Sequence, residues 1–247
     1  MAAPLIEVCV DSVAGVLAAE EGGAARVELC ADLLEGGTTP SPGMLSTALA
    51  HTALDVLVLV RPRGGDFLYT DLELETMLQD IDAVKAAGAA GVVLGVLDRH
   101  GDVDVERTRQ LVARARPMQV TFHRAFDMTR DPEAALETLI DLGVDRVLTS
   151  GQKETASDSL DLLSSLVRQA GERIIVMPGG LDEGNISQVA RATGARELHF
   201  AARSQVQSGM EHRNHDCGMG SGSPLDEFHH WETDVDQVRR FVAAVSA

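Results

Sequence analysis

Short runs of Val, Ile and Leu alternate with longer amphipathic stretches along most of the chain. The short runs have the length of buried strands, whereas the longer stretches, rich in Ala, Leu and Glu, are typical of helices. The runs predict strands at Leu5–Val10, Arg26–Cys30, Val56–Arg61, Gly91–Gly95, Met118–His123, Asp145–Ser150, Ile174–Met177 and Glu197–Ala201. Strands and helices that alternate in this way indicate parallel βα units.

Helix termini are predicted where the local sequence favours them. Ser12 is a candidate N-cap, Pro132 stands in a first turn, and Gly88 follows a predicted last turn. We predict helices over Ser12–Glu21, Asp71–Ala87, Asp131–Leu142 and, at the end of the chain, Asp234–Val245. The stretch Ser204–Glu232 is rich in Gly, Ser and His, so we expect a long loop between the eighth strand and the final helix.

A repeated pattern favours a closed barrel over an open sheet. Segments beginning at Gly23, Gly88, Gly143 and Gly194 share a helix-ending Gly, a short connection and a strand. They precede every second predicted strand, which is the fourfold repeat that a (β/α)₈ barrel gives. An open doubly wound sheet also has Gly-led connections, but the chain lacks a GxGxxG fingerprint. We therefore predict an α/β fold, a single TIM-barrel domain over residues 1–247.

Charge and composition exclude several classes of partner. The net charge of −17 argues against nucleic acid or an anionic membrane as the main partner, although a local basic pocket remains compatible with it. The first residues do not have the pattern of a leader peptide and no run of 18 apolar residues occurs, so we expect neither a leader nor a membrane-spanning segment. Its cysteines are Cys9, Cys30 and Cys217, an odd number that indicates reduced thiols. We expect a cytoplasmic protein, and nothing in the sequence implies an organic cofactor.

Polar side chains gather where the predicted strands end, which is the face of a TIM barrel that carries active sites. The first two strands end with Glu7, Cys9, Glu28 and Cys30. Later strand ends add Arg61, Arg63, His123, Arg124, Asp127, Ser150, Gly179, Gly180 and His199. Side chains two positions apart share one side of a strand, so the repeat places Glu28 and His199 in one interior layer. A buried carboxylate there needs a partner, for which Arg61, His123 and His199 are the candidates.

This gathering is typical of an enzyme that acts on a small anionic or phosphorylated metabolite. Arg61 and Arg63 are candidates for an anion clamp, Glu7 or Glu28 for the general base and His123 for the acid or hydrogen-bond donor. Further candidates are Asp127 for catalysis and Arg124, Ser150, Gly179, Gly180 and His199 for binding the anion. The alternatives are a structural ion network and, for the Gly pair, a plain tight turn.

The cysteines offer a second chemistry. Cys9 and Cys30 on neighbouring strands are candidates for a two-thiolate site that binds a soft cation such as Cu(I), or they are ordinary buried thiols. His212, His215 and Cys217 lie close in sequence and are candidate metal ligands, unless they belong to a solvated loop.

Long motifs resemble one known family. The segments Glu7–Asp11, Arg26–Cys30, Glu35–Ser41, Arg61–Phe67, Thr121–Asp127 and Arg146–Gly151 resemble the CutC family, which is named for copper homeostasis. The resemblance implies a (β/α)₈ barrel, a cytoplasmic homo-oligomer (a dimer or tetramer), a link to copper tolerance, and Cu(I) binding at Cys9 and Cys30. It assigns no role to Cys217. Our first interpretation is a copper-handling protein, the second is an enzyme at the same barrel mouth, and the third is a structural or interaction protein.

Overall fold

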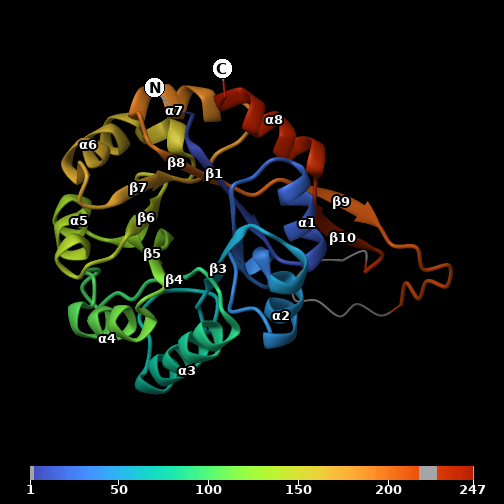
Figure 1. The fold of residues 1–247 in the computed structure, drawn as a ribbon, viewed down its shortest axis with the longest axis horizontal. Helices are drawn as coiled ribbons and strands as arrows, with labels where there is room; N and C mark the ends of the chain where they lie inside the picture. The colour runs from blue at the N-terminus through green and yellow to red at the C-terminus, as the bar shows by residue number, and fades with distance from the viewer. Residues whose placement is uncertain (1–2, 217–226, 247) are drawn as a thin grey trace.

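The computed structural model describes residues 3–216 and 227–246, in which a ring of parallel strands is surrounded by helices (Figure 1). The strands are β1 Leu5–Val10, β2 Arg26–Leu29, β3 Asp55–Leu59, β4 Gly91–Leu94, β5 Gln119–Phe122, β6 Arg146–Thr149, β7 Ile175–Pro178 and β8 Glu197–Phe200. They pair in the order β7-β6-β5-β4-β3-β2-β1-β8. Since β1 pairs with both β2 and β8, and β7 lies beside β8, the sheet curls into a barrel. The predicted (β/α)₈ architecture is confirmed.

A helix follows each barrel strand and covers its outer face. The helices are α1 Val13–Glu21, α2 Pro42–His51, α3 Asp71–Ala87, α4 Val105–Ala115, α5 Pro132–Asp141, α6 Leu160–Ala170, α7 Ile186–Thr193 and α8 Val235–Val245. Short 3₁₀ turns lie at Leu33–Glu35, Arg124–Met128 and Ala156–Ser159. Outward strand residues such as Val8, Val58 and Val92 are buried in the main hydrophobic core, which helix residues complete. Polar groups that must face inward are therefore confined to the alternate strand positions.

The four helices that the sequence predicts, α1, α3, α5 and α8, begin within one residue of the predicted starts. Ser12 accepts a hydrogen bond from the backbone N–H of Gly15, and Thr70 forms a capping box with Glu73. Pro132 occupies the first position of α5, where its missing N–H costs nothing. Because each helix starts at a fixed residue, the loop between a strand and the next helix has a fixed length. These loops carry residues of the barrel mouth.

The expected long loop after the eighth strand contains, at its two ends, a pair of strands that the sequence did not predict. Within Ser204–Glu232 and its edges, β9 (Arg203–Gln207) pairs antiparallel with β10 (His229–Thr233). Both strands are mostly polar and neither contains a buried residue, so they lack the apolar alternation by which a strand is recognised. Mutual hydrogen bonding stabilises this hairpin, which lies beside α1 (Figure 1). The final helix α8 follows β10 as predicted.

A chain of alternating charges fills the interior of the barrel. Arg26 on β2 donates to Glu7 on β1 at 2.5 Å and also to Glu197 on β8. Arg146 on β6 donates to Glu197 at 2.5 Å from Nε and to Thr121 at 3.2 Å. All four charged side chains are buried, and each charge has an opposite neighbour. Buried ions are tolerated only when they are paired in this way.

We predict that Arg26→Leu lowers the free energy of unfolding by about 3–5 kcal/mol, because it leaves the buried Glu7 and Glu197 with fewer partners. Urea denaturation followed by circular dichroism measures the change. The matched control is Arg196→Leu, which removes an arginine from an exposed pair with Glu172 and should barely move the midpoint. Equal shifts in the two variants would contradict a structural role for the interior network.

Candidate functional site

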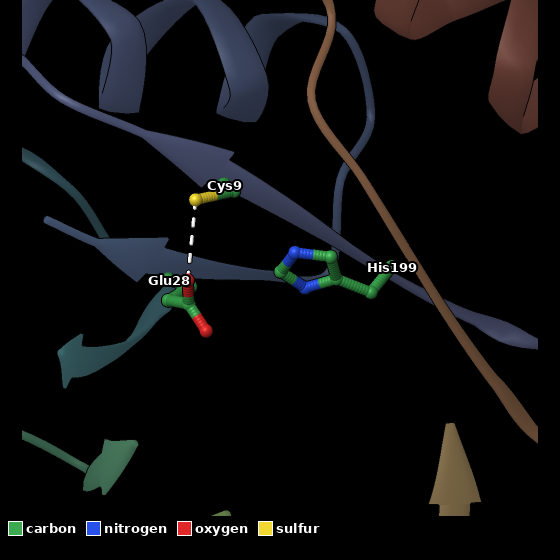
Figure 2. Close-up of side chains that lie close together, drawn as sticks. All are labelled: Cys9, Glu28 and His199. Carbon is green, nitrogen blue, oxygen red and sulfur yellow. Dashed lines mark hydrogen bonds between the residues drawn. The ribbon is translucent and has the colours of Figure 1, made fainter. Parts of the chain in front are cut away.

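Three potential metal ligands meet above the interior network. Cys9 on β1, Glu28 on β2 and His199 on β8 each offer a ligand atom, and these atoms lie within 4.8 Å of one another. Figure 2 shows the three side chains converging from their separate strands, with Cys9 hydrogen-bonded to Glu28 Oε1 at 3.2 Å. The expectation that Glu28 and His199 share one layer is thus met by the geometry. Sulfur, oxygen and nitrogen donors in such proximity can hold a cation.

A second sulfur stands beside the first. Cys9 Sγ and Cys30 Sγ are 3.8 Å apart, and both thiols are buried. Cys30 also donates to the carbonyl of Val10 at 3.4 Å. Sulfurs that share one ion at about 2.3 Å each lie at most about 4.6 Å apart. The observed separation is therefore short enough for both sulfurs to bind one ion.

His199 is oriented from behind by the interior network. Its Nδ1 lies 2.8 Å from Glu7 Oε1, while Glu7 Oε2 accepts from Arg26. Burial opposes the charged forms of both partners, yet their hydrogen bond and mutual attraction raise the pKa of His199 and lower that of Glu7 to about 2. With Nδ1 engaged, Nε2 is the nitrogen available toward Cys9 and Glu28. Metal-binding histidines commonly have such a carboxylate behind them.

The two acids of the site, Cys9 and Glu28, both have a pKa above the ordinary value. The hydrogen bond to Cys30, burial and the charge of Glu28 raise the pKa of Cys9. Burial also raises the pKa of Glu28. Glu28 Oε2 is buried and has no hydrogen-bond partner among the described residues. The expected partners Arg61 and His123 do not bond to Glu28, so one of its oxygens remains available to a ligand.

A cavity of about 420 Å³ opens over these groups. Its polar lining includes Cys9, Glu28, Arg61, His123, Arg124, Gly180 and His199, together with apolar side chains from several strands and loops. Glu7, by contrast, is fully buried below the cavity with both oxygens bonded. If the mouth performs acid–base chemistry, Glu28 rather than Glu7 is the carboxyl group that reaches a ligand.

His123 contributes a neutral ring to the cavity wall. Its Nδ1 accepts from the backbone N–H of Ala125 at 3.1 Å, so the ring proton resides on Nε2. Burial and the nearby charge of Arg61 lower the pKa of His123 to about 3. The Nε2 atom is buried without a partner in the described structure. It is a hydrogen-bond donor that lacks an acceptor.

The candidate anion clamp is not assembled as the sequence predicts. Arg61 lines the cavity, but Arg63 is not among the lining residues and instead bonds to Glu73 at 2.5 Å and Asp66 at 3.1 Å. Its guanidinium also stacks over the ring of Tyr69. Arg61 therefore faces the cavity and Arg63 faces the loop and helix beside it, although only one residue separates them in the sequence.

Other predicted ligands are engaged with one another at the rim. Asp127 accepts from Thr149 at 2.5 Å and from the Ser150 hydroxyl at 2.9 Å. Arg124 donates to Asp127 at 2.7 Å and to Ser150 at 2.6 Å. Asp127 thus fastens the turn after β5 to the end of β6, as expected of a structural ion network. Arg124 alone of these three also lines the cavity.

The remaining candidates lie in different places. Gly180 lines the cavity, whereas the Gly179 N–H bonds to Thr149, and α7 begins only at Ile186. His212 is exposed, and the His215 ring contacts the Phe228 ring at a centroid distance of 5.3 Å. Cys217 lies outside the described residues. Because α7 begins six residues after Gly180, the Gly pair does not lie at a helix N-terminus, where it could bind a phosphate.

The sequence interpretation missed Arg26, Arg146 and Glu197. The signal was present, because Arg26 stands two positions before Glu28, and Glu197 two positions before His199. Alternation along a strand places each pair on the same interior side. The same rule that predicted the upper layer also predicts the charged layer beneath it.

Comparison with known proteins identifies close relatives of the chain. The CutC family model matches residues 4–204. A family protein CutC from Mesorhizobium japonicum is 52% identical over 246 residues, covering 99% of this chain and 95% of the relative. The human copper homeostasis protein cutC homolog is 50% identical, covering 95% of this chain and 86% of the relative. These matches span the whole barrel.

Solved structures agree with the fold. A crystal structure of CutC from Streptococcus agalactiae has a TM-score of 0.76 and 33% identity, covering 80% of this chain and 98% of that one. Phosphoribosylanthranilate isomerase from Thermotoga maritima has a TM-score of 0.57 at 15% identity, covering 99% of this chain and 98% of that one, and shows the fold alone. Among the described residues, no helix is both long and apolar enough to cross a membrane.

We predict that the His123 ring stays neutral, with its proton on Nε2, when the pH falls from 8 to about 5. Its pKa is about 3 in the folded protein and about 6.5 when unfolded. The folded state then binds fewer protons, so the stability that His123 contributes is present above about 6.5 and is lost as the pH falls toward 3. Nitrogen-15 spectra of the histidine rings report the tautomer. A titration midpoint near 6.5 would contradict the prediction.

Proposed function

Because this chain belongs to the CutC family, we propose that it takes part in copper homeostasis by binding Cu(I) through Cys9 and Cys30. The mouse relative, 50% identical over 95% of this chain and 87% of its own length, is named copper homeostasis protein cutC homolog. The observation that carries the proposal is the 3.8 Å separation of the two buried sulfurs. We also propose that the chain works in the cytoplasm as a homo-oligomer.

The chemistry of the donors favours copper in its reduced state. Thiolates are soft ligands and prefer Cu(I), whereas a carboxylate such as Glu28 suits harder ions. Cys9 is common to the sulfur pair and to the group with Glu28 and His199. The thiol protons must leave as the ion binds, and Glu28 Oε1, which already accepts the Cys9 S–H, is placed to receive one.

We expect one tight equivalent of Cu(I) in the wild type and its loss in Cys9→Ser and in Cys30→Ser, because one sulfur alone makes a poor site for a soft ion. An anaerobic titration against a coloured Cu(I) chelator measures the affinity. Cys217→Ser is the matched control, since it removes a cysteine outside the proposed pair and should leave the affinity unchanged.

Glu28→Gln separates the two possible donor sets. If the sulfurs alone bind the ion, this variant should keep the affinity within about threefold, because glutamine retains the shape of the side chain. Tight Cu(I) binding that survives in a Cys9→Ser/Cys30→Ser double variant would overturn the proposed copper site.

A further inference from the structure

Arg61 is a buried cation without a carboxylate partner. Its side chain is only 6% exposed, yet no ion pair joins it to any acidic residue in the described part of the chain. Its terminal nitrogens instead donate to the backbone carbonyls of Glu35, Gly37 and Gly65, at 2.8, 2.6 and 3.0 Å. Carbonyl oxygens satisfy the N–H groups but do not neutralise the charge, and uncompensated buried charges are costly.

Arg61 and His123 each retain one unused donor. The Nε–H of Arg61 and the Nε2–H of His123 are both buried without a hydrogen-bond partner among the described residues. Both residues line the 420 Å³ cavity, and His123 is only 5% exposed. Phe67 packs against both, with its ring 5.4 Å from the Arg61 guanidinium carbon and 4.9 Å from the centre of the His123 ring. Two unused donors and one buried cation without a carboxylate partner therefore belong to the wall of this cavity.

We propose that the cavity binds a small organic carboxylate, whose negative charge faces Arg61 and whose oxygens accept from Arg61 Nε–H and His123 Nε2–H. The rest of the lining indicates an apolar body for this ligand. Leu33, Leu59, Phe67, Leu148, Leu181 and Phe200 contribute most of the wall. A ligand of this class supplies the missing counter-charge and buries its hydrocarbon part against those side chains.

A phosphate group fits the same wall less well. It needs more donors and more positive charge than the one cation and one neutral imidazole that face this part of the cavity. Arg63 is bonded elsewhere, and Arg124 is neutralised by Asp127. The carboxylate site also lies on different strands from the thiols, because Arg61 follows β3 and His123 follows β5, while Cys9 and Cys30 belong to β1 and the end of β2. The carboxylate proposal rests on Arg61 and His123 and needs neither thiol, although Cys9 lines the same cavity.

Isothermal titration of the metal-free wild type tests the ligand class with 3-methylbutanoate, its uncharged analogue 3-methylbutanamide, and inorganic phosphate. We expect the carboxylate to bind at least about tenfold more tightly than either alternative, since a hydrogen bond to a charged acceptor is stronger than one to a neutral acceptor. Equal binding of the amide, tighter binding of phosphate, or no binding of the carboxylate at millimolar concentration would overturn the proposal.

Variants locate the site. Arg61→Lys should weaken carboxylate binding by at least about tenfold, because lysine lacks the Nε–H that we propose donates to the ligand. Arg107→Lys is the matched control, since Arg107 also donates to a backbone carbonyl, that of Tyr69, but does not line the cavity. Because Arg61 also fastens loops, His123→Phe provides a second test that leaves the guanidinium in place, and it too should weaken binding. Unchanged affinity in a folded Arg61→Lys or His123→Phe protein would refute the assignment, as would an equal loss in Arg107→Lys.

Discussion

The constraint on which the rest of the structure depends is charge neutrality inside the barrel. Glu7, Arg26, Glu197 and Arg146 alternate in sign across four strands, so none of them is left as a bare ion in a medium of low polarity. An apolar filling would also close a barrel, but it would not orient His199. Here Arg26 holds one oxygen of Glu7, and the other oxygen bonds to Nδ1 of His199. The paired charges thereby orient the ring that reaches the layer above them.

The barrel itself was accessible from the sequence because its signals are local and periodic. Strand length, the Gly-led repeat, the cap at Ser12 and the first-turn Pro132 each depend on neighbouring residues. The β9–β10 hairpin was missed because its strands are polar on both faces, and only their mutual pairing defines them. No periodicity in one segment reveals a partner more than twenty residues away.

The site divides in the same way. The alternation of side chains along the strands predicts that Glu28 and His199 share one layer. The same alternation places Arg26 on the interior side of its strand, where it bonds to Glu7, but this pairing was not predicted. The separate surroundings of Arg61 and Arg63 were beyond prediction. Arg61 is held by carbonyl groups of two loops, and the positions of those carbonyls depend on the loop backbone rather than on any side chain. The ends of the predicted strands identify which residues are candidates for the site. The loop conformation then decides which of those side chains face the cavity and can bind a ligand.

The pairing of β1 with β8 has a consequence for how the protein is made. The contact between His199 and Glu7 joins residues 192 positions apart. The first strand that leaves the ribosome therefore pairs with β8 only after most of the chain has been synthesised. Until β8 has emerged, Cys9 and Cys30 belong to an open sheet that lacks both Glu197 and His199. The surroundings of the thiol pair are therefore completed only late in synthesis, when β8 pairs with β1. A chain truncated before β8 has both cysteines but lacks the part of the cavity wall that β8 provides.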